Sequence, residues 1–425
     1  MRTQAKTLLL LISAATTALP QAMPQNPTTL VRTGEDQREA LKINDSIYQA
    51  IGFGNTFMVT TPEGNVIIDT SMPQVARRHQ RLLKAVSGAP VRYIILTHGH
   101  GDHTGGVALW KEPGTHVVAQ RNHVEFLNYQ KRLENFFAIR NAAQFVLPIP
   151  RAPEWAGNNG ATILADILFD DKYEFTLGGV KFEIYRTPGE TPDHLTVWIP
   201  QFKAAFTGDN YYESFPNIYT LRGTPPRWAL DYIGSLKKVL ALRPEFVLPS
   251  HGMPVRGNAE ITRRLTQYCD AIQYVHDEVV KGMNAGKDLY TLMNQIYLPP
   301  DLNVGESYGK LTWSVRGIYE GYAGWFDMNP ATMYATPVSA VYGDMVRLAG
   351  GPAAVVALAL ERVQSGKAVE ALHLTDMVLA QDPANQAALK ARLAALEALR
   401  DASHNTNELG WLLFGIRETK QKLAP

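Results

Sequence analysis

Short apolar runs alternate with turn signals from about residue 44 to residue 254, a pattern typical of strands and helices that follow one another in a layered domain. "FMVTTPEGNVIIDT" predicts a hairpin that turns at residues 62–65, residues 75–86 have helical spacing, and "VRYIILT" predicts a buried strand. Further strands are predicted at "GTHVVAQ", "KFEIYRTPG", "LTVWIP", "AAFTGD" and "EFVLPSHG", and helices at "HVEFLNYQKRLENFFAIRNA" and "PRWALDYIGSLKKVLAL". This mixture indicates an α/β domain built on two sheets or on one large sheet.

The pattern becomes almost wholly helical after Pro254, beginning with "NAEITRRLTQYCDAIQYVHDEVVKGM". Residues 353–400 predict paired antiparallel helices, separated by Gly366 and by the "DPAN" turn at residues 382–385. Their alanine-rich packing resembles one or two tetratricopeptide-type hairpins. We therefore predict a catalytic domain over residues 23–257 and an all-α domain over residues 258–425, which docks on its own chain or on a copy of it.

The N-terminus has the layout of a secretory signal peptide, predicted here over residues 1–22. Arg2 and Lys6 precede an apolar stretch at residues 8–19, and small residues follow around Ala18 and Ala22. A frayed terminal helix is the alternative. We expect a secreted protein, exported to a bacterial periplasm. No other stretch reaches transmembrane length, so we expect a soluble mature protein without stable membrane insertion.

Net charge and cysteine content limit which partners and which kinds of metal site we expect. The 425 residues include 41 basic and 40 acidic side chains, a net charge of +1, which gives no reason to expect nucleic acid or an anionic membrane as partner. Cys269 is the single cysteine, which excludes an internal disulfide and a metal site built on cysteines.

Residues 93–106, "YIILTHGHGDHTGG", drive a buried strand into a dense cluster of polar groups that suit zinc or a similar metal. His98 and His100 can project to one side of a glycine-rich turn, while Asp102 and His103 reach a second point nearby. This spacing favours two adjacent metals over one. A metal-free loop is the alternative, which is disfavoured because unpaired buried histidines are costly.

"THGHGDHTGG" resembles the H-x-H-x-D-H motif of the metallo-β-lactamase superfamily. The resemblance implies an αββα sandwich, two mixed sheets flanked by helices, with the metals where strand-end loops gather. It also implies three further ligands at strand ends: His194 in "PDHLTVW", Asp209 in "AAFTGDNYY" and His251 in "FVLPSHG".

By this resemblance two Zn²⁺ ions bind per chain. His98, His100 and His194 hold one, Asp102, His103 and His251 hold the second, and Asp209 bridges them. Two such metals share a water, lower its pKa and make a hydroxide nucleophile, so we expect hydrolysis of a small-molecule ester, with Asp102 essential to it. Asp69, at another strand end, is expected to orient a ligand histidine.

Two stretches resemble the class III alkyl sulfatases within this superfamily. "FPNIYTLRGTPPRWALDYIGSL" (residues 215–236) matches their Asn-Leu-Tyr-Thr-Leu-Arg-Gly segment, which implies that Asn217, Tyr219 and Arg222 help to hold the sulfate. "SVRGIYEGYAGWFDMNPATM" (residues 314–333) matches the start of their dimerisation domain, which implies a homodimer formed through the helical domain. Arg222 in a structural ion pair and Tyr219 in the core are the alternatives, and Trp325 with Phe326 is expected in the core or in an interface.

Three departures from the sulfatase pattern keep other substrates open. The family has glutamates where this chain has His194 and Asp209, its histidines flanking the Asn-Leu-Tyr segment are replaced near Glu213 and Pro216, and it continues into a lipid-carrier-like domain beyond the position of Pro425. We therefore predict a periplasmic dizinc hydrolase of sulfate monoesters that are shorter or bulkier than alkyl detergents. Carboxylic esters, lactones or β-lactams on the same scaffold are the alternative. A non-catalytic protein whose helical tail recruits a partner is the third hypothesis.

Overall fold

The computed structural model describes residues 33–148, 162 and 164–424. They fall into two compact units. The sheet unit comprises the described residues up to Glu134 and those from residue 162 to Tyr322, and the helical unit comprises residues 135–148 and 323–424. The predicted signal peptide, residues 1–22, lies outside the described residues, and export stays a prediction.

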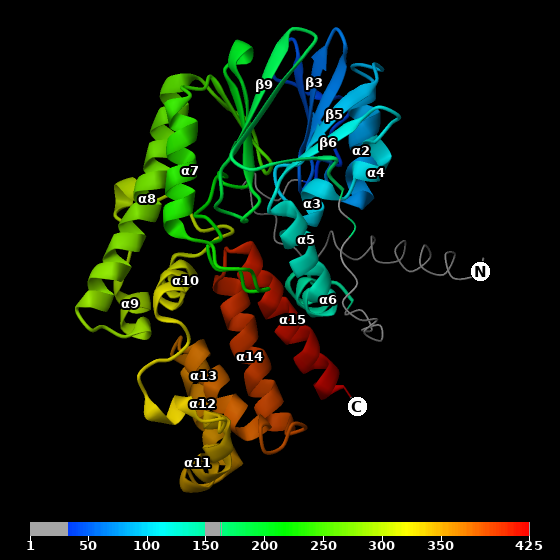
Figure 1. The fold of residues 1–425 in the computed structure, drawn as a ribbon. Coiled ribbons are helices and arrows are strands. Elements are labelled where there is room, and N and C mark those ends of the chain that lie inside the picture. The colour runs from blue at the N-terminus through cyan, green and yellow to red at the C-terminus, as the bar shows by residue number, and fades with distance from the viewer. Residues whose placement is uncertain (1–32, 149–161, 163, 425) are drawn as a thin grey trace. The chain divides into compact units, whose positions relative to one another are not determined.

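Two mixed sheets form the centre of the sheet unit (Figure 1). The first sheet has seven strands in the order β1 (Leu41–Lys42), β2 (Ile47–Ala50), β3 (Thr56–Thr61), β4 (Gly64–Ile68), β5 (Val91–Ile95), β6 (His116–Gln120) and β7 (Ile167–Phe169). The second has six in the order β13 (Val255–Arg256), β12 (Phe246–Pro249), β11 (Ala204–Gly208), β10 (Leu195–Ile199), β9 (Val180–Arg186) and β8 (Lys172–Leu177). β4 to β7 run parallel, as do β11 and β12, and the other neighbours are antiparallel.

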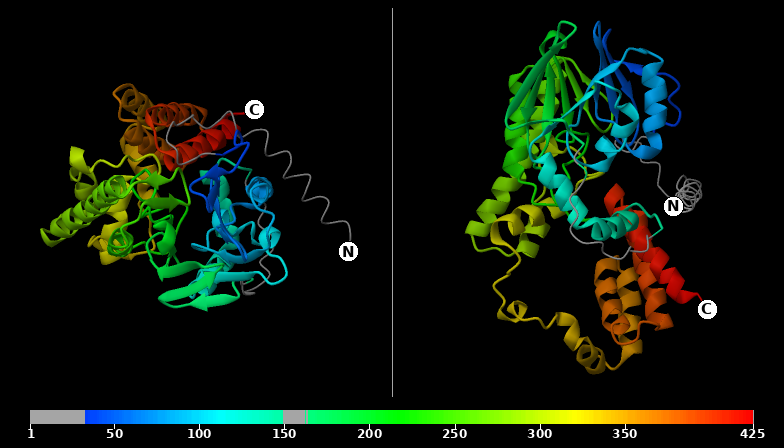
Figure 2. Two further views of the ribbon diagram at one scale, coloured as in Figure 1. Left: turned by 90° about the horizontal axis from the view of Figure 1, so that it is seen from above. Right: turned by 45° about the vertical axis from the view of Figure 1, so that its right-hand side comes forward.

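Alternation along the strands divides the apolar side chains between an inner and two outer layers. Val66 and Ile68 of β4 join Phe206 of β11 in a core between the sheets, whereas Ile67 packs outward against helices. Helices α2 (Pro73–Lys84) and α4 (Val107–Trp110) cover the first sheet, and α7 (Ala229–Ala241) and α8 (Asn258–Asn284) cover the second. Figure 2 shows these layers from two further sides. The predicted αββα sandwich is confirmed.

The hairpin is confirmed, because Thr61 pairs with Gly64 across its turn. The prediction of one continuous helix from residue 123 is wrong. The chain instead forms two helices, α5 (His123–Arg132) and α6 (Glu134–Gln144), which are separated at Leu133. The reason is that α6 packs within the helical unit on α15 (Thr406–Leu423). Gln144 donates to Asn407 at 2.8 Å, and Gly410 has no room for a Cβ, which would lie 1.7 Å from the Gln144 carbonyl oxygen.

The helical unit also contains α11 (Tyr342–Leu348), α12 (Pro352–Gln364), α13 (Ala368–Leu379) and α14 (Gln386–Ala402), which share one apolar cluster. Gly366 and residues 382–385 separate α12, α13 and α14, as predicted. Elsewhere in the described residues, the remaining helices are α3 (Gly101–Thr104), α9 (Leu289–Gln295), α10 (Leu311–Ala323) and the short 3₁₀ turns Pro200–Phe202, Pro300–Leu302, Pro330–Met333 and Val338–Val341, most of them in the sheet unit. The predicted change from strands to helices at residue 258 coincides with the start of α8. Because α8 packs on the second sheet, a domain boundary at this point stays a prediction.

One stretch of the helical unit, residues 325–348, carries many exposed apolar side chains. They are Trp325, Phe326, Met328, Met333, Tyr334, Val338, Val341, Met345 and Leu348. Trp325 and Phe326 are therefore not part of a core within this chain. No single helix in the described part of the chain is long and apolar enough to cross a membrane, and Val338–Leu348 with Pro352–Gln364 passes that test only as a pair bent by 100°.

Candidate metal centre

The segment between β5 and α4 carries the first four candidate ligands, and the ends of β11 and β12 bring Asp209 and His251 to it. β5 ends at Ile95, and His98 and His100 follow in the loop, which leads into α3. Asp209 directly follows β11, and His251 lies two residues beyond β12. Parallel neighbours β11 and β12 end at the same edge of their sheet, which is why Asp209 and His251 meet.

Asp102, His103 and His251 form one group of side chains placed to hold a metal ion. The Asp102 Oδ2 atom lies 3.4 Å from the Nε2 atoms of both His103 and His251. Asp209 Oδ2 lies 3.5 Å and 3.0 Å from the same two nitrogens. Four ligand atoms about 2.1 Å from a tetrahedral zinc ion would be about 3.4 Å from one another. The spacing of this group therefore fits a zinc-sized ion.

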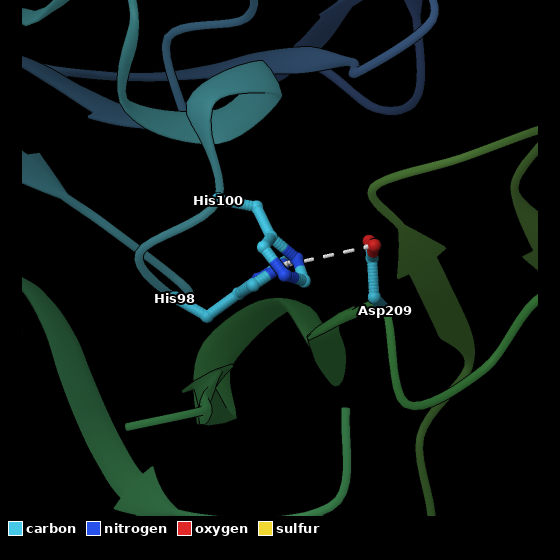
Figure 3. A group of neighbouring side chains, drawn as sticks. All are labelled: His98, His100 and Asp209. Carbon is cyan, nitrogen blue, oxygen red and sulfur yellow. Dashed lines mark hydrogen bonds and ion pairs between the residues drawn. The ribbon is translucent and has the colours of Figure 1, made fainter. Parts of the chain in front are cut away.

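His98, His100 and Asp209 form the second such group (Figure 3). The Nε2 atom of His98 and the Nδ1 atom of His100 are 2.9 Å apart, and Asp209 Oδ2 lies 3.7 Å from His98 Nε2. The same Asp209 oxygen lies 3.7 Å from a nitrogen of this group and 3.5 Å and 3.0 Å from two nitrogens of the other, a position that suits a bridging carboxylate. Among the described residues, His103 Nε2 and Asp209 Oδ1 are buried without a hydrogen-bond partner, a costly state that a metal ion would relieve.

His194, expected with His98 and His100, is beside this group but is not brought into it. Its ring stacks on that of His98 with centroids 5.3 Å apart, and its Nε2 atom accepts a hydrogen bond from the Asp209 backbone N–H at 3.0 Å. The lone pair that would bind a metal is therefore engaged. His194 as a ligand stays a prediction, with this hydrogen bond as a competing role.

Glu190 is a candidate ligand that was not predicted. It is buried, and its Oε1 atom lies 3.8 Å from His100 Nδ1. Its other oxygen is held by the Arg227 guanidinium at 2.5 Å and by the Tyr232 hydroxyl, which donates at 2.6 Å. The available signal was in "TPGETPDH", where a glutamate precedes His194 by four residues, together with the glutamate ligands that the resemblance to the alkyl sulfatases implied.

The histidine pKa values shift in opposite directions in the two candidate metal-binding groups. Burial holds the pKa values of His98 and His100 well below their ordinary value, so both rings are neutral and offer lone pairs. Burial also disfavours a charge on His103, but Asp102, Asp209 and Asp69 outweigh it and raise its pKa well above the ordinary value. A site that stabilises a positive charge on a fully buried ring is a site that favours a cation.

Asp69 orients His103, as predicted. Its Oδ2 atom accepts from His103 Nδ1 at 2.9 Å, from the Thr97 hydroxyl at 2.8 Å and from the Ser250 hydroxyl at 2.7 Å. Because a proton is held on Nδ1 there, Nε2 is the ring atom of His103 that a metal ion beside Asp102 and Asp209 would use.

The residues predicted to hold the sulfate, Asn217, Tyr219 and Arg222, differ in the partners that their side chains have. Asn217 is buried with a fixed backbone, and neither atom of its side-chain amide has a partner within the described part of the chain. The charges of Arg222 and Arg227 add to the effect of burial in lowering the pKa of His100, so both guanidinium groups act on the centre. Tyr219 instead donates its hydroxyl to Glu320 of α10 at 2.9 Å.

Comparison with known proteins matches two family models to the chain. Residues 50–251 match the metallo-beta-lactamase superfamily, and residues 290–422 match the alkyl sulfatase dimerisation family. A linear primary-alkylsulfatase of a Pseudomonas species is 28% identical over 86% of this chain and 74% of its own length. The alkyl/aryl-sulfatase BDS1 of Saccharomyces cerevisiae is 27% identical over 89% of this chain and 64% of its own length.

A solved structure of the sec-alkylsulfatase Pisa1 from a Pseudomonas species has the same fold. Its TM-score is 0.82 at 22% sequence identity, over 91% of this chain and 66% of that one. The chain thus spans about two thirds of the length of several of the relatives that it matches.

Fold and site together define the class: an αββα sandwich that gathers histidines and carboxylates in two metal-binding groups at its strand ends. The chain carries a metallo-β-lactamase domain followed by an alkyl sulfatase dimerisation domain. The relatives named above are hydrolases of sulfuric esters, which confirms the predicted hydrolase class.

Proposed function

We propose that this protein is a dinuclear zinc hydrolase of sulfate monoesters. The observation that carries the proposal is the pair of candidate ligand groups on either side of one Asp209 oxygen, which lies 3.0–3.7 Å from histidine nitrogens of both, with guanidinium groups acting on the same centre. Relatives that match most of the chain are alkylsulfatases, which supports the choice of sulfate esters.

His98, His100 and Glu190 would hold one metal, and Asp102, His103 and His251 the other, with Asp209 between them. Two metals there would supply a hydroxide at neutral pH and a Lewis acid for the ester oxygen. The chain's own side chains do the positioning. Asp69 holds the proton of His103 on Nδ1, and Arg227 with Tyr232 fixes one oxygen of Glu190 so that the other faces His100.

Recognition of the sulfate would come from fixed donors on the segment after β11. Arg222 offers a planar fork of N–H donors suited to an oxyanion, and Asn217 offers an amide with unused hydrogen-bonding capacity. A sulfate monoester keeps a full negative charge through hydrolysis, so donors of fixed charge stabilise both its binding and its reaction.

Glu190 also weakens the main reason for the alternative substrates. The His/Asp ligand set of His194 and Asp209 favoured carboxylic esters, lactones or β-lactams. The carboxylate of Glu190 beside His100 provides the glutamate that the sulfatases use, four residues before His194. The alternative keeps the support of Asp209, which stands where the sulfatase pattern has a second glutamate, and of the two other departures from that pattern.

Protein purified without added metal should contain two zinc equivalents per chain and should hydrolyse sulfate esters until a chelator removes the zinc. Elemental analysis gives the metal content. One assay panel, with alkyl sulfates of graded length, an aryl sulfate, a lactone, a thioester and a chromogenic β-lactam, gives the substrate. Less than one metal equivalent contradicts the dinuclear site, and turnover of the lactone or β-lactam without the sulfates contradicts the sulfatase assignment.

We also propose that the chain forms a homodimer through residues 325–348. An apolar surface of this extent is unusual on a protein that stays monomeric, and the segment lies within the matched dimerisation domain. Light scattering should give twice the mass of one chain, 47.1 kDa. Leu348→Glu should shift the mass towards the monomer, whereas Leu230→Glu, at an exposed leucine of the sheet unit, should not. A wild-type mass of one chain contradicts the proposal.

A further inference from the structure

The five-residue loop Ile51–Asn55, between β2 and β3, contacts two ligands of one metal-binding group. We call these residues the 51–55 loop. Its sequence, "IGFGN", carries no histidine and no carboxylate, and it lies about 45 residues before the histidine motif. The contacts of its backbone nevertheless converge on His251 and Asp102.

His251 is oriented by Phe53. The Nδ1 atom of His251 hydrogen-bonds to the Phe53 carbonyl oxygen, and the two rings meet edge to face with centroids 5.1 Å apart. A carbonyl oxygen can only accept, so the proton of this imidazole is held on Nδ1. With its proton held on Nδ1, His251 can offer Nε2 to a metal ion beside Asp102 and Asp209, whose oxygens lie 3.4 Å and 3.0 Å from that nitrogen.

Asp102 rests on Gly54. A Cβ atom at residue 54 would lie 2.1 Å from the Asp102 carbonyl oxygen, so only glycine lets the two backbones approach this closely. The Gly54 carbonyl oxygen in turn accepts a hydrogen bond from the Ser71 hydroxyl at 2.6 Å. The loop therefore sets how near the start of α3, and with it the Asp102 carboxylate, comes to His251.

Asn55 ties the loop to the strand end that carries His251. This side chain is fully buried, and its amide nitrogen donates to the carbonyl oxygens of Pro249 at 3.1 Å and Gly252 at 3.0 Å. Its backbone N–H donates to Ser250 at 2.8 Å. Three bonds thus clamp the residues on both sides of His251 to the loop.

His79 of α2 fixes the other end of the loop. Its ring is buried, with Nε2 3.0 Å from the Ile51 carbonyl oxygen and Nδ1 2.9 Å from the Thr56 hydroxyl. Both ends of the loop are therefore anchored, at Ile51 by a helix and at Asn55 by the second sheet.

The other ligand group rests on different elements. The Gly99 carbonyl oxygen, between His98 and His100, accepts from the Gln130 side chain of α5 at 2.9 Å. The ring of Phe126, also on α5, meets that of His100 at 5.4 Å. Each group thus has its own support, one from α5 and one from the 51–55 loop.

We propose that the 51–55 loop is the element that retains the metal held by Asp102, His103 and His251, and that Gly54 and Asn55 are positioning residues for it. The proposal rests on the two-metal site of the proposed function. Loosening the loop lets His251 and Asp102 drift from their mutual spacing while His98 and His100 keep theirs. One metal is then lost before the other.

Zinc retention at graded chelator concentrations, measured by dialysis and elemental analysis, tests the proposal. Asn55→Ala should weaken the affinity for one of the two zinc ions about 10–100-fold, the usual cost of a lost supporting contact, and leave the other unchanged. Gln130→Ala, the matched variant on α5, should shift the other ion. Ser71→Ala should act in the same direction as Asn55→Ala with a smaller shift, and it keeps the test open if Asn55→Ala does not fold.

Thermal unfolding of the metal-free proteins separates positioning from general destabilisation. Equal melting temperatures with a selective loss of one zinc ion support the proposal. Loss of both ions together, no change in either, or a shift of the same ion by Asn55→Ala and Gln130→Ala overturns it. A wild-type protein that holds fewer than two zinc ions instead overturns the proposed function, so the two failures are distinguishable.

Discussion

Replacing Asp102 by alanine should lower kcat/KM for a sulfate ester by about 10³-fold or more, equivalent to about 4 kcal/mol of transition-state stabilisation. Burial raises the pKa of this carboxyl, but His103 and His251 outweigh that effect and leave the pKa below its ordinary value, so Asp102 is ionised at working pH. It lies 3.4 Å from both ligand nitrogens. Without it, one metal loses a charged ligand that no neighbour replaces.

The fold should survive this change, because Asp102 lies in the short helix α3 with 17% of its side chain exposed and Asp69 still orients His103. Steady-state kinetics, zinc content and thermal unfolding would be measured on the same preparation. Asp166→Ala, which removes an exposed carboxylate paired with Lys111 at 2.9 Å, is the control and should stay within about 3-fold of wild type. Wild-type turnover by Asp102→Ala would exclude it from the metal centre.

The sandwich was predictable because its strands alternate or run apolar over lengths that only buried strands have. Val66, Ile67 and Ile68 divide between two cores in the way the period of a strand requires. The position of the ligands followed from the same reasoning, since each of His98, Asp209 and His251 follows an apolar run. Strand ends that share a sheet edge bring such residues together whatever their separation along the chain.

The order of ligands within the centre was not predictable to the same degree. His194 and Glu190 are four residues apart in one loop, and the sequence shows both without showing which one faces His100. Contacts with residues that are distant along the chain decide which of the two lies beside His100. Arg227, which lies 37 residues later, holds one oxygen of Glu190, while the backbone of Asp209 takes the lone pair of His194. Contacts of this range leave no periodic trace in a sequence.

The break at Leu133 has a similar cause. Residues 123–144 have uniform helical propensity and no proline or glycine, so local signals predict one helix. The interruption is imposed by α6 packing on α15, through Gln144 and Asn407, which are 263 residues apart. The helical unit therefore includes a segment that the sequence places in the middle of the sheet domain.

Tyr219 illustrates the limit of transferring a role by motif. It lies between Asn217 and Arg222 in a segment that resembles the sulfatases, yet its hydroxyl is engaged by Glu320. Its role in holding a sulfate stays a prediction, and Glu320 would have to release it. Asn217 has no such competitor among the described residues, because its amide is buried and unpartnered.

Replacing Arg222 by alanine should lower kcat/KM for a sulfate ester by about 10²–10³-fold, or about 3–4 kcal/mol, while turnover of a neutral carboxylic ester should fall less than about 3-fold. Only the sulfate carries a charge that needs a fixed positive partner at this position. Burial lowers the pKa of His100, and the Arg222 guanidinium adds to that effect. Burial raises the pKa of Tyr308, and the same guanidinium opposes that rise, so its charge is felt where the substrate would lie.

Arg222→Lys separates charge from geometry in the same assay. Lysine keeps the positive charge but loses the planar fork that binds two oxygens at once. It should therefore recover part of the activity on sulfates, but not the part of the preference for sulfates over carboxylic esters that depends on contacts with two oxygens. Zinc content should be unchanged in both variants, because Arg222 contributes no metal ligand. Equal losses on sulfate and carboxylic esters would remove Arg222 as an anion clamp and would return carboxylic esters to equal standing, since the charge of the substrate would then have no counterpart in this segment.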